Sequence, residues 1–320
     1  MAGATHANRA PHFHRKQRGL AIRMKKRFKV LGQENNFLGI DAFCGWEESR
    51  VVVLQAPLEQ TTSYMKGTAA GPAALIEASH QVETFDDELK TETYRRGIAT
   101  LPALKFKKDE PEAAVRLIEK QVNELLAENK RLAMIGGEHT VTVGAVRAYR
   151  KRFPNLSVLH LDAHTDLRES YEDSPLSHAC AMARVKESCP FVSVGIRSLC
   201  QEEFNCIQRE KLVVFDIHRI TMDESWMDEA LSRLGDTVYV TFDLDALDPS
   251  IMPAVGTPEP GGMDWNTTIR FLRRAFKEKV VVGFDMVELC PLPGAEYGVF
   301  SAAKLFYRMI GYWYGLENQK

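Results

Sequence analysis

Three short stretches of the 320-residue sequence place carboxylate and imidazole side chains directly after apolar runs. Two of them, "DAHTD" and "DLD", space these side chains at every second position, so an extended chain points them to one side. Six such side chains crowded together would repel one another and lose hydration unless a cation compensated them. The pattern therefore predicts a metal site, and its candidate ligands are His139, Asp162, His164, Asp166, Asp243 and Asp245.

The ligand types indicate which metal the site would take. Oxygen ligands with two nitrogens and no sulfur favour Mn²⁺ ahead of Zn²⁺. Six ligands are too many for one catalytic ion with an open position, but they suit two ions about 3.5–4 Å apart that share a carboxylate. A lone DxD pair often only caps a turn. The interpretation of Asp243 and Asp245 as metal ligands therefore depends on the other motifs. His160 alternates with leucines inside its run, and we expect it to be a hydrogen-bonded core histidine.

These residues need a scaffold, and the rest of the sequence predicts one. Apolar, β-branched runs alternate with segments of helical period, the clearest of which covers residues 111–128. Runs that are apolar on both faces suit a parallel sheet covered by helices on either side. We expect an α/β protein, a three-layer α/β/α fold with a mainly parallel sheet, and a single catalytic domain over residues 30–320. The expected strands cover 50–57, 131–137, 157–164, 191–196, 211–217, 237–245 and 279–288, and the remaining helices lie near 72–80, 140–151, 224–234, 266–277 and 299–315.

Charge is distributed unevenly along the chain. Residues 1–29 contain nine basic and no acidic residues, and the whole chain has a net charge of −2. Residues 30–320 therefore have a net charge of −11, since −2 − 9 = −11. Such an arm can bind nucleic acid or a membrane surface or act as a transit peptide, but we expect a disordered, solvated arm. We find no apolar run long enough to cross a bilayer and no secretory signal. The six cysteines form no CxxC pair, and we expect reduced thiols and a cytoplasmic protein.

Several motifs together resemble one known family. "GGEHT" (136–140), "DAHTD" (162–166), "FDLDALDPSIMPAVGTPEPGG" (242–262) and "MVELCP" (286–291) are similar to motifs of the ureohydrolases, the arginase/agmatinase family. "GTAAGPAALIEAS" (67–79) resembles an early segment of the same family, and the likeness extends from about residue 50 to 310. The resemblance implies an arginase-like fold, two Mn²⁺ per subunit, and hydrolysis of a guanidino group to urea and an amine.

The resemblance also implies roles for individual residues. Asp162 and Asp243 would bridge the two metals, His139 and Asp166 would complete the shell of one of them, and His164 would complete that of the other.

By the same resemblance, Asp245 would be a terminal ligand, and a metal-bridging hydroxide, held by Asp166, would attack the guanidinium carbon. Glu288 would hydrogen-bond the guanidinium, which a carboxylate can meet in a bidentate way. His178 would shuttle a proton or hold the substrate, a role that suits its pKa. From the residues alone, Glu288 could be an exposed acid and His178 a helix-start residue. We expect Asp248 to form a turn or support the ligands.

The loop after "DAHTD" bears on the substrate. It reads "LRESYEDSPLSHA", lacks the SxN pattern of arginine-specific members and resembles bacterial and archaeal agmatinases. The acids Glu169, Glu172 and Asp173 in it could favour a dicationic substrate. We therefore expect agmatinase activity, giving putrescine and urea in polyamine biosynthesis, with guanidinobutyrase, arginase and formiminoglutamase activities as alternatives. Glu59 and Val255 depart from the family pattern near the mouth of the site.

A different class of function remains open, namely a non-catalytic metal-binding protein whose basic arm binds nucleic acid. Against it, the intact ligand set and Glu288 would serve no purpose in a scaffold. We expect a small cationic guanidino substrate, no membrane or nucleic-acid partner and, from the resemblance, a homo-oligomer, trimer or hexamer.

Overall fold

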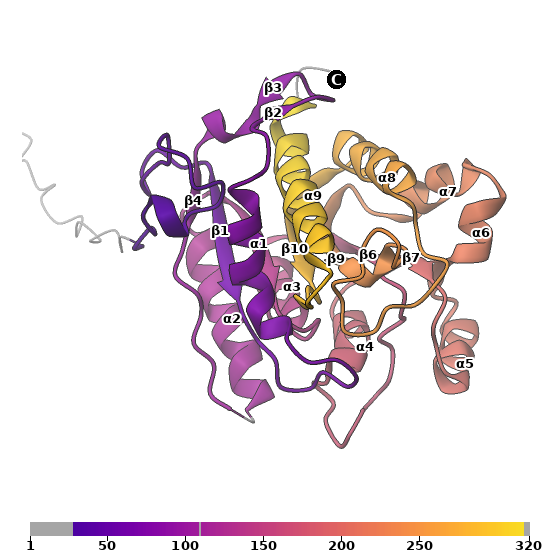
Figure 1. Ribbon diagram of the computed structural model, residues 1–320. Coiled ribbons are helices and arrows are strands. Elements are labelled where there is room, and N and C mark those ends of the chain that lie inside the picture. Colours follow the sequence, from indigo (N-terminus) through magenta and orange to yellow (C-terminus); the bar gives the residue numbers. More distant parts are fainter. Residues whose placement is uncertain (1–27, 109, 317–320) are drawn as a thin grey trace, which may run out of the picture.

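The protein folds into three layers, with a parallel sheet between two layers of helices (Figure 1). The computed structural model describes residues 28–108 and 110–316. Every pair of neighbouring strands in the eight-stranded sheet is parallel. In spatial order the strands are β4 (Ile98–Thr100), β1 (Val51–Ala56), β5 (Arg131–Gly136), β10 (Val280–Val287), β9 (Thr237–Asp243), β6 (Leu156–Leu161), β7 (Phe191–Ile196) and β8 (Val213–Asp216).

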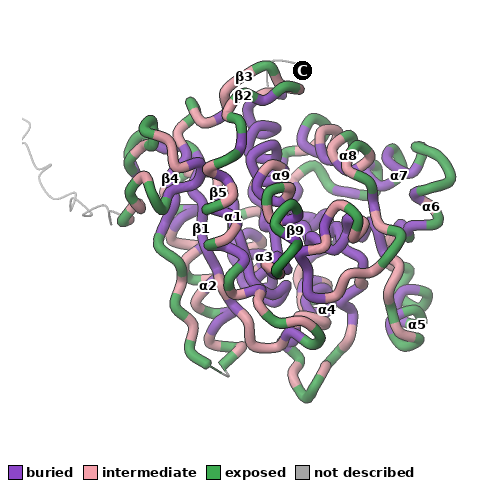
Figure 2. The backbone as a smooth tube through the Cα atoms, viewed as in Figure 1, coloured by how far each residue is buried: buried purple, intermediate pink, exposed green. Residues whose placement is uncertain are grey.

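Two hydrophobic clusters cover the two faces of the sheet, which lies buried between them (Figure 2). Strand β1 shows the principle, because Val51 and Val53 join one cluster and Val52 and Leu54 the other. The first cluster is covered by α1 (Gly71–Ser79), α6 (Ile217–Met222), α7 (Ser225–Arg233), α8 (Trp265–Glu278) and α9 (Glu296–Gly315). The second is covered by α2 (Pro111–Leu126), α3 (Val141–Arg152), α4 (Ala181–Lys186) and α5 (Gln201–Glu210).

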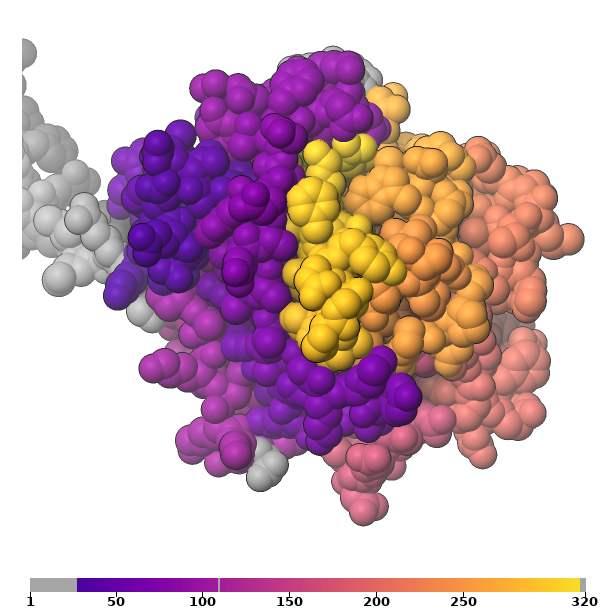
Figure 3. Space-filling view, in the orientation of Figure 1, coloured from indigo at the N-terminus to yellow at the C-terminus, as the bar shows by residue number. Residues whose placement is uncertain are grey.

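The segments α1, α9 and α8 lie side by side on one face of the molecule, where α9 packs against both of its neighbours (Figure 3). The predicted fold class is confirmed, and the seven predicted strands are all present in the described part of the chain. Sequence patterns missed the eighth strand, β4, because three residues are too short to show a period. They also missed α4, α5, α6 and the small hairpin of β2 (Phe85–Asp86) and β3 (Thr91–Glu92).

The strand predicted for 211–217 ends one residue early, at Asp216. The Asp216 carboxylate accepts a hydrogen bond from the Arg219 N–H at 2.8 Å and so caps the start of α6. Because α6 begins at the next residue, Ile217, the strand cannot continue, which explains the shorter element. The strands predicted for 157–164 and 237–245 also end early, at Leu161 and Asp243.

Short 3₁₀ helices complete the elements: η1 (Gln33–Asn35), η2 (Thr68–Ala70), η3 (Thr93–Arg96), η4 (His178–Cys180) and η5 (Leu244–Ala246). All six cysteines are free thiols, as expected. Within residues 28–108 and 110–316, no helix is both long and apolar enough to cross a membrane. Residues 1–27 of the predicted basic arm lie outside the described residues.

Candidate metal centre

Four neighbouring strands in the middle of the sheet carry the candidate site at their carboxyl ends. The strands β5, β10, β9 and β6 are consecutive in the sheet, so the loops that follow them meet at one edge. The loop after β5 supplies His139, the end of β9 supplies Asp243 and Asp245, and the segment after β6 supplies the DxHxD residues. The fold thus brings together all six candidate ligands: His139, Asp162, His164, Asp166, Asp243 and Asp245.

The first group of ligands surrounds the Nδ1 atom of His139. Carboxylate oxygens of Asp166, Asp162 and Asp243 lie 3.0, 3.1 and 3.3 Å from this nitrogen. His139 is completely buried, and none of these oxygens is in line for a hydrogen bond to Nδ1. A buried ring nitrogen without a hydrogen-bond partner among the described residues, facing three carboxylates, is the arrangement that a shared cation would complete.

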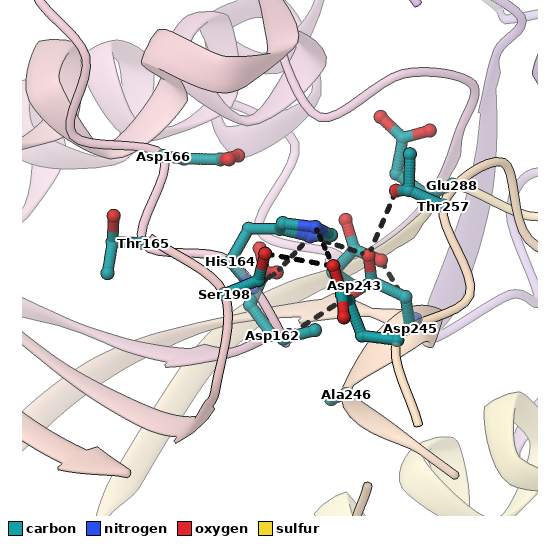
Figure 4. A network of polar contacts seen from close by, with 12 residues as sticks. Asp162, His164, Thr165, Asp166, Ser198, Asp243, Asp245, Ala246, Thr257 and Glu288 are labelled. Atoms are coloured by element: carbon teal, nitrogen blue, oxygen red, sulfur yellow. Dashed lines mark hydrogen bonds and ion pairs between the residues drawn. The ribbon is translucent and has the colours of Figure 1, made fainter. Parts of the chain in front are cut away.

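The second group centres on His164 and shares Asp162 with the first (Figure 4). The Nδ1 atom of His164 lies 2.8 Å from Asp245 Oδ2 and 3.6 Å from Asp162 Oδ1. Since Asp162 Oδ2 faces His139, the two oxygens of this carboxylate face different groups. Asp245 is held in place because its Oδ1 accepts the Ala163 N–H at 2.9 Å. This arrangement suits two adjacent ions with Asp162 as a bridge.

Charge crowding supports the same interpretation. Burial raises the pKa of Asp166, Asp243 and Asp245 above the ordinary range, and neighbouring carboxylates, Asp162 among them, raise it further. Burial opposes ionisation of Asp162 too, but the charge of the neighbouring His160 and the hydrogen bond from its ring help to hold the pKa of Asp162 well below its usual value. Four carboxylates that cannot all ionise together are a donor set that fits divalent cations.

His160 is buried against the same cluster but is already fully bonded. Its Nε2 lies 2.8 Å from Asp162 Oδ2, and its Nδ1 lies 2.8 Å from the hydroxyl of Ser193. His160 and Asp162 also form, with His139, a group close enough to hold a metal ion. Because both ring nitrogens of His160 have partners, we interpret it as support for the Asp162 carboxylate. The sequence prediction of a hydrogen-bonded core histidine is confirmed.

A cavity of about 140 Å³ opens above the ligands, and both other candidate residues line it. Glu288 follows β10 and accepts the His139 N–H on Oε1 at 2.7 Å, whereas its Oε2 accepts no hydrogen bond from the described residues. The Nδ1 atom of His178 lies 3.7 Å from Glu288 Oε1. Burial lowers the pKa of His178, but the nearby Glu288 carboxylate outweighs this effect and raises the pKa to about 9. The cavity thus pairs a carboxylate with a cationic imidazole.

Two site residues occupy a backbone conformation that side chains rarely adopt. Asp166 has a φ of +52° and Glu288 a φ of +64°, both in the left-handed region. For Glu288 the turn is fixed by its N–H, which donates to the Gly137 carbonyl at 2.8 Å. This φ turns the backbone sharply at both residues, where each carboxylate enters the cavity. Backbone strain of this kind is often kept at functional sites.

Sequence reasoning missed the residues that hold the loops of the site. The Glu138 carboxylate accepts the N–H groups of Gln60 and Thr61, both at 2.7 Å, and the Thr61 hydroxyl in turn accepts the His178 N–H at 2.8 Å. The Arg197 guanidinium donates to several carbonyls of the loops after β9, including that of Asp245 at 2.7 Å.

Asp248 binds backbone N–H groups of its own loop, as expected for a turn former. Only the "E" within GGEHT could have drawn attention to Glu138, and the sequence carries no comparable signal for Arg197.

Known proteins are similar to this chain in sequence and in fold. A sequence model described as "Arginase family" matches residues 49–311. The chain is 38% identical over 300 residues to N(1)-aminopropylagmatine ureohydrolase of Synechocystis sp., covering 91% of this chain and 98% of that protein. It is 33% identical over 277 residues to an agmatinase of Bacillus cereus, covering 84% of this chain and 93% of that protein.

Solved structures agree with these sequence comparisons. The agmatine ureohydrolase of Thermoplasma volcanium superposes with a TM-score of 0.81 at 30% identity, covering 89% of this chain and 96% of that one. Proclavaminate amidino hydrolase from Streptomyces clavuligerus has the same TM-score of 0.81 at 23% identity, covering 90% and 100% of the two chains, which shows a shared fold.

Proposed function

The chain belongs to the arginase family, and we propose that it removes urea from agmatine-type amines, with N(1)-aminopropylagmatine as the preferred substrate and agmatine as the second. It is a ureohydrolase of guanidino compounds. From the sequence alone, the loop after "DAHTD" favours agmatine. The relatives at 38% identity move the longer amine ahead of it.

One observation supports the proposal above all: four of the six candidate ligands line a single cavity together with Glu288 and His178. A structural metal site would need only the ligands. A carboxylate with a free oxygen at the cavity wall is suited to a planar guanidinium, which it can meet with paired, charge-assisted hydrogen bonds. The combination of these groups therefore favours hydrolysis of a guanidino compound over a non-catalytic metal protein.

The proposed roles are those that the family resemblance implies, and the positions of the side chains support them. Two divalent cations would be held by six side chains, those of His139, Asp162, His164, Asp166, Asp243 and Asp245, with Asp162 between the group around His139 and the group around His164. Such cations would activate water as a nucleophile near neutral pH. We propose Mn²⁺, because the donors are mostly oxygen with two imidazole nitrogens.

The other residues would bind the substrate and move protons. Glu288 Oε2 would hold the guanidinium with its carbon toward the cluster. Asp166, which lines the cavity and contacts His139, would accept the proton that the water loses and pass it to the departing amine. His178, held cationic by Glu288, would exchange protons between the cavity and solvent.

Charge at the cavity supports a cationic substrate. Four carboxylates line it, from Asp166, Asp243, Asp245 and Glu288, and outside the candidate ligands it has two basic side chains, Arg168 and His178. Divalent cations would offset the charge of the three aspartates, which leaves Glu288 as the acid that a guanidinium can meet on the cavity wall. A guanidinium bound there would replace its lost hydration with a charge-assisted contact.

The test is a urea assay on metal-free and Mn²⁺-loaded protein with N(1)-aminopropylagmatine, agmatine, arginine and guanidinobutyrate. We expect activity only after loading, with kcat/KM highest for the first substrate and next for agmatine. A preference for arginine or guanidinobutyrate would refute the substrate assignment, and urea release without metal would refute the metal centre. We further propose a cytoplasmic homo-oligomer, which gel filtration with light scattering would check.

A further inference from the structure

A chain of hydroxyl groups runs from the candidate metal ligand His139 into the core. The Nε2 atom of His139 lies 2.9 Å from Thr241 Oγ1, on the side of the ring opposite the carboxylate cluster. Thr241 Oγ1 lies 3.1 Å from Thr142 Oγ1, and the Thr142 hydroxyl donates to Asp285 Oδ2 at 3.0 Å. All four residues are completely buried.

Asp285 is an unusual occupant of its position. It lies within β10, between β5 and β9, where a β-branched apolar residue would suit the strand better. Its Oδ2 also accepts the Tyr239 hydroxyl at 2.7 Å, whereas its buried Oδ1 has no hydrogen-bond partner among the described residues. A buried carboxyl group with one unpaired oxygen destabilises the folded protein. Packing alone therefore does not explain why an aspartate occupies this position.

The contacts of Asp285 fix the direction of every hydrogen bond in the chain. The hydroxyls of Thr142 and Tyr239 can reach Oδ2 only as donors. Because the Thr142 hydrogen is used in this way, the Thr142 oxygen must accept from Thr241. The Thr241 oxygen is then left as an acceptor for a proton on His139 Nε2.

This direction determines which ring nitrogen of His139 keeps a lone pair. A neutral imidazole carries one proton, and here Thr241 holds it on Nε2. In the neutral ring that a metal ion requires, Nδ1 therefore presents its lone pair to the space shared with Asp162, Asp166 and Asp243. The conclusion is the same if Asp285 carries a proton on Oδ1, because Oδ2 accepts hydrogen bonds in either state.

We propose that Asp285 is a positioning residue that acts through Thr142 and Thr241 to keep the His139 proton on Nε2 and so present Nδ1 to a metal ion. The proposal rests on the proposed metal centre. Partners of this kind behind a ligating histidine orient the ring and fix its tautomer, and their loss typically weakens metal binding about 10- to 100-fold.

The test measures Mn²⁺ affinity by competition with a chelating dye, on full-length metal-free protein whose fold has been checked by circular dichroism. We expect Thr241→Val, which keeps the shape of the side chain, and Asp285→Ala each to weaken binding at one of two sites by about 10- to 100-fold. The double variant should be no weaker than Thr241→Val alone, because both changes break the same chain. If Asp285→Ala does not fold, Thr142→Val removes the hydroxyl link instead.

Two further variants distinguish the loss of these hydrogen bonds from a general disturbance of the core. Asp285→Asn keeps an accepting oxygen and should recover most of the affinity that Asp285→Ala loses. Tyr149→Phe removes a buried hydroxyl that has no hydrogen-bond partner among the described residues, from a ring 4.8 Å from that of Tyr239, and should bind Mn²⁺ like the wild type.

The outcomes distinguish the positioning role from the metal centre itself. If His139→Ala leaves both Mn²⁺ affinities unchanged, the proposed metal centre is wrong. If His139→Ala weakens binding but Thr241→Val and Asp285→Ala do not, only the role of Asp285 is wrong. Additive effects in the double variant, or no recovery in Asp285→Asn, would also overturn it.

Discussion

Replacement of Glu288 by glutamine tests whether this carboxylate binds the guanidinium. A glutamine side chain is almost the same size, and its oxygen can still accept the His139 N–H that Glu288 Oε1 now accepts at 2.7 Å. What the change removes is the negative charge at the cavity wall. Because Glu288 is not a proposed metal ligand, we expect the fold and the manganese content to be retained.

The structure sets the size of the expected effect. The Glu288 side chain is only 10% exposed, so solvent screens its charge weakly. A hydrogen bond to a charged group contributes about 1.5–3 kcal/mol. Since about 1.36 kcal/mol corresponds to a factor of ten, kcat/KM should fall about 10- to 150-fold.

The assay is steady-state urea release with agmatine and N(1)-aminopropylagmatine at saturating Mn²⁺, beside the metal content of each protein. Glu119→Gln is a matched control, because Glu119 is also largely buried, with a side chain 17% exposed, but pairs with Lys151 on the surface between α2 and α3. It should retain the wild-type kcat/KM. A Glu288→Gln enzyme with unchanged kcat/KM, or one that loses manganese, would refute the assigned role.

Three other changes follow from the same structure. Asp243→Asn should lower the manganese content below two ions per chain and urea release by orders of magnitude, and a fully loaded, active variant would contradict this. In metal-free protein His178 has a folded pKa of about 9 against about 6.5 when unfolded, so the stability that it contributes should be complete below pH 6.5 and be lost as pH rises through 9. Thermal melts should show that loss in the wild type and not in Glu288→Gln. Gly137→Ala would place a Cβ 2.0 Å from the Leu58 carbonyl oxygen and should cost about 1–3 kcal/mol in the free energy of unfolding, measured with urea.

The sequence was most informative where local pattern and chemistry coincide. Alternation in "DAHTD" and "DLD" pointed to side chains that the structure does bring together. The parallel sheet does this by placing the strand ends side by side, because β6 ends at Leu161 and β9 at Asp243, before most of these residues. His160 was predicted to be a hydrogen-bonded core residue, and the structure confirms this, because it lies inside β6 with both ring nitrogens bonded.

Contacts between residues distant in the chain could not be predicted. Arg197 reaches the loops after β9 through a turn that no local pattern indicates, and Thr61 meets His178 across 117 residues. Asp285 was also missed, because in the sequence it is a single polar residue within an apolar run. Only the fold places Thr142 and Tyr239 beside it. Strand β4 is too short to show any period.

Two metal ions held around Asp162, at the carboxyl ends of β5, β9 and β6, are the basis of the proposed chemistry. Anomalous diffraction from manganese-loaded crystals, recorded on both sides of the manganese absorption edge, would locate such ions directly. We predict two peaks about 3.5–4 Å apart, one beside His139 and the other beside His164, with the Asp162 carboxylate contacting both. A single peak, or peaks away from these residues, would contradict the two-metal centre.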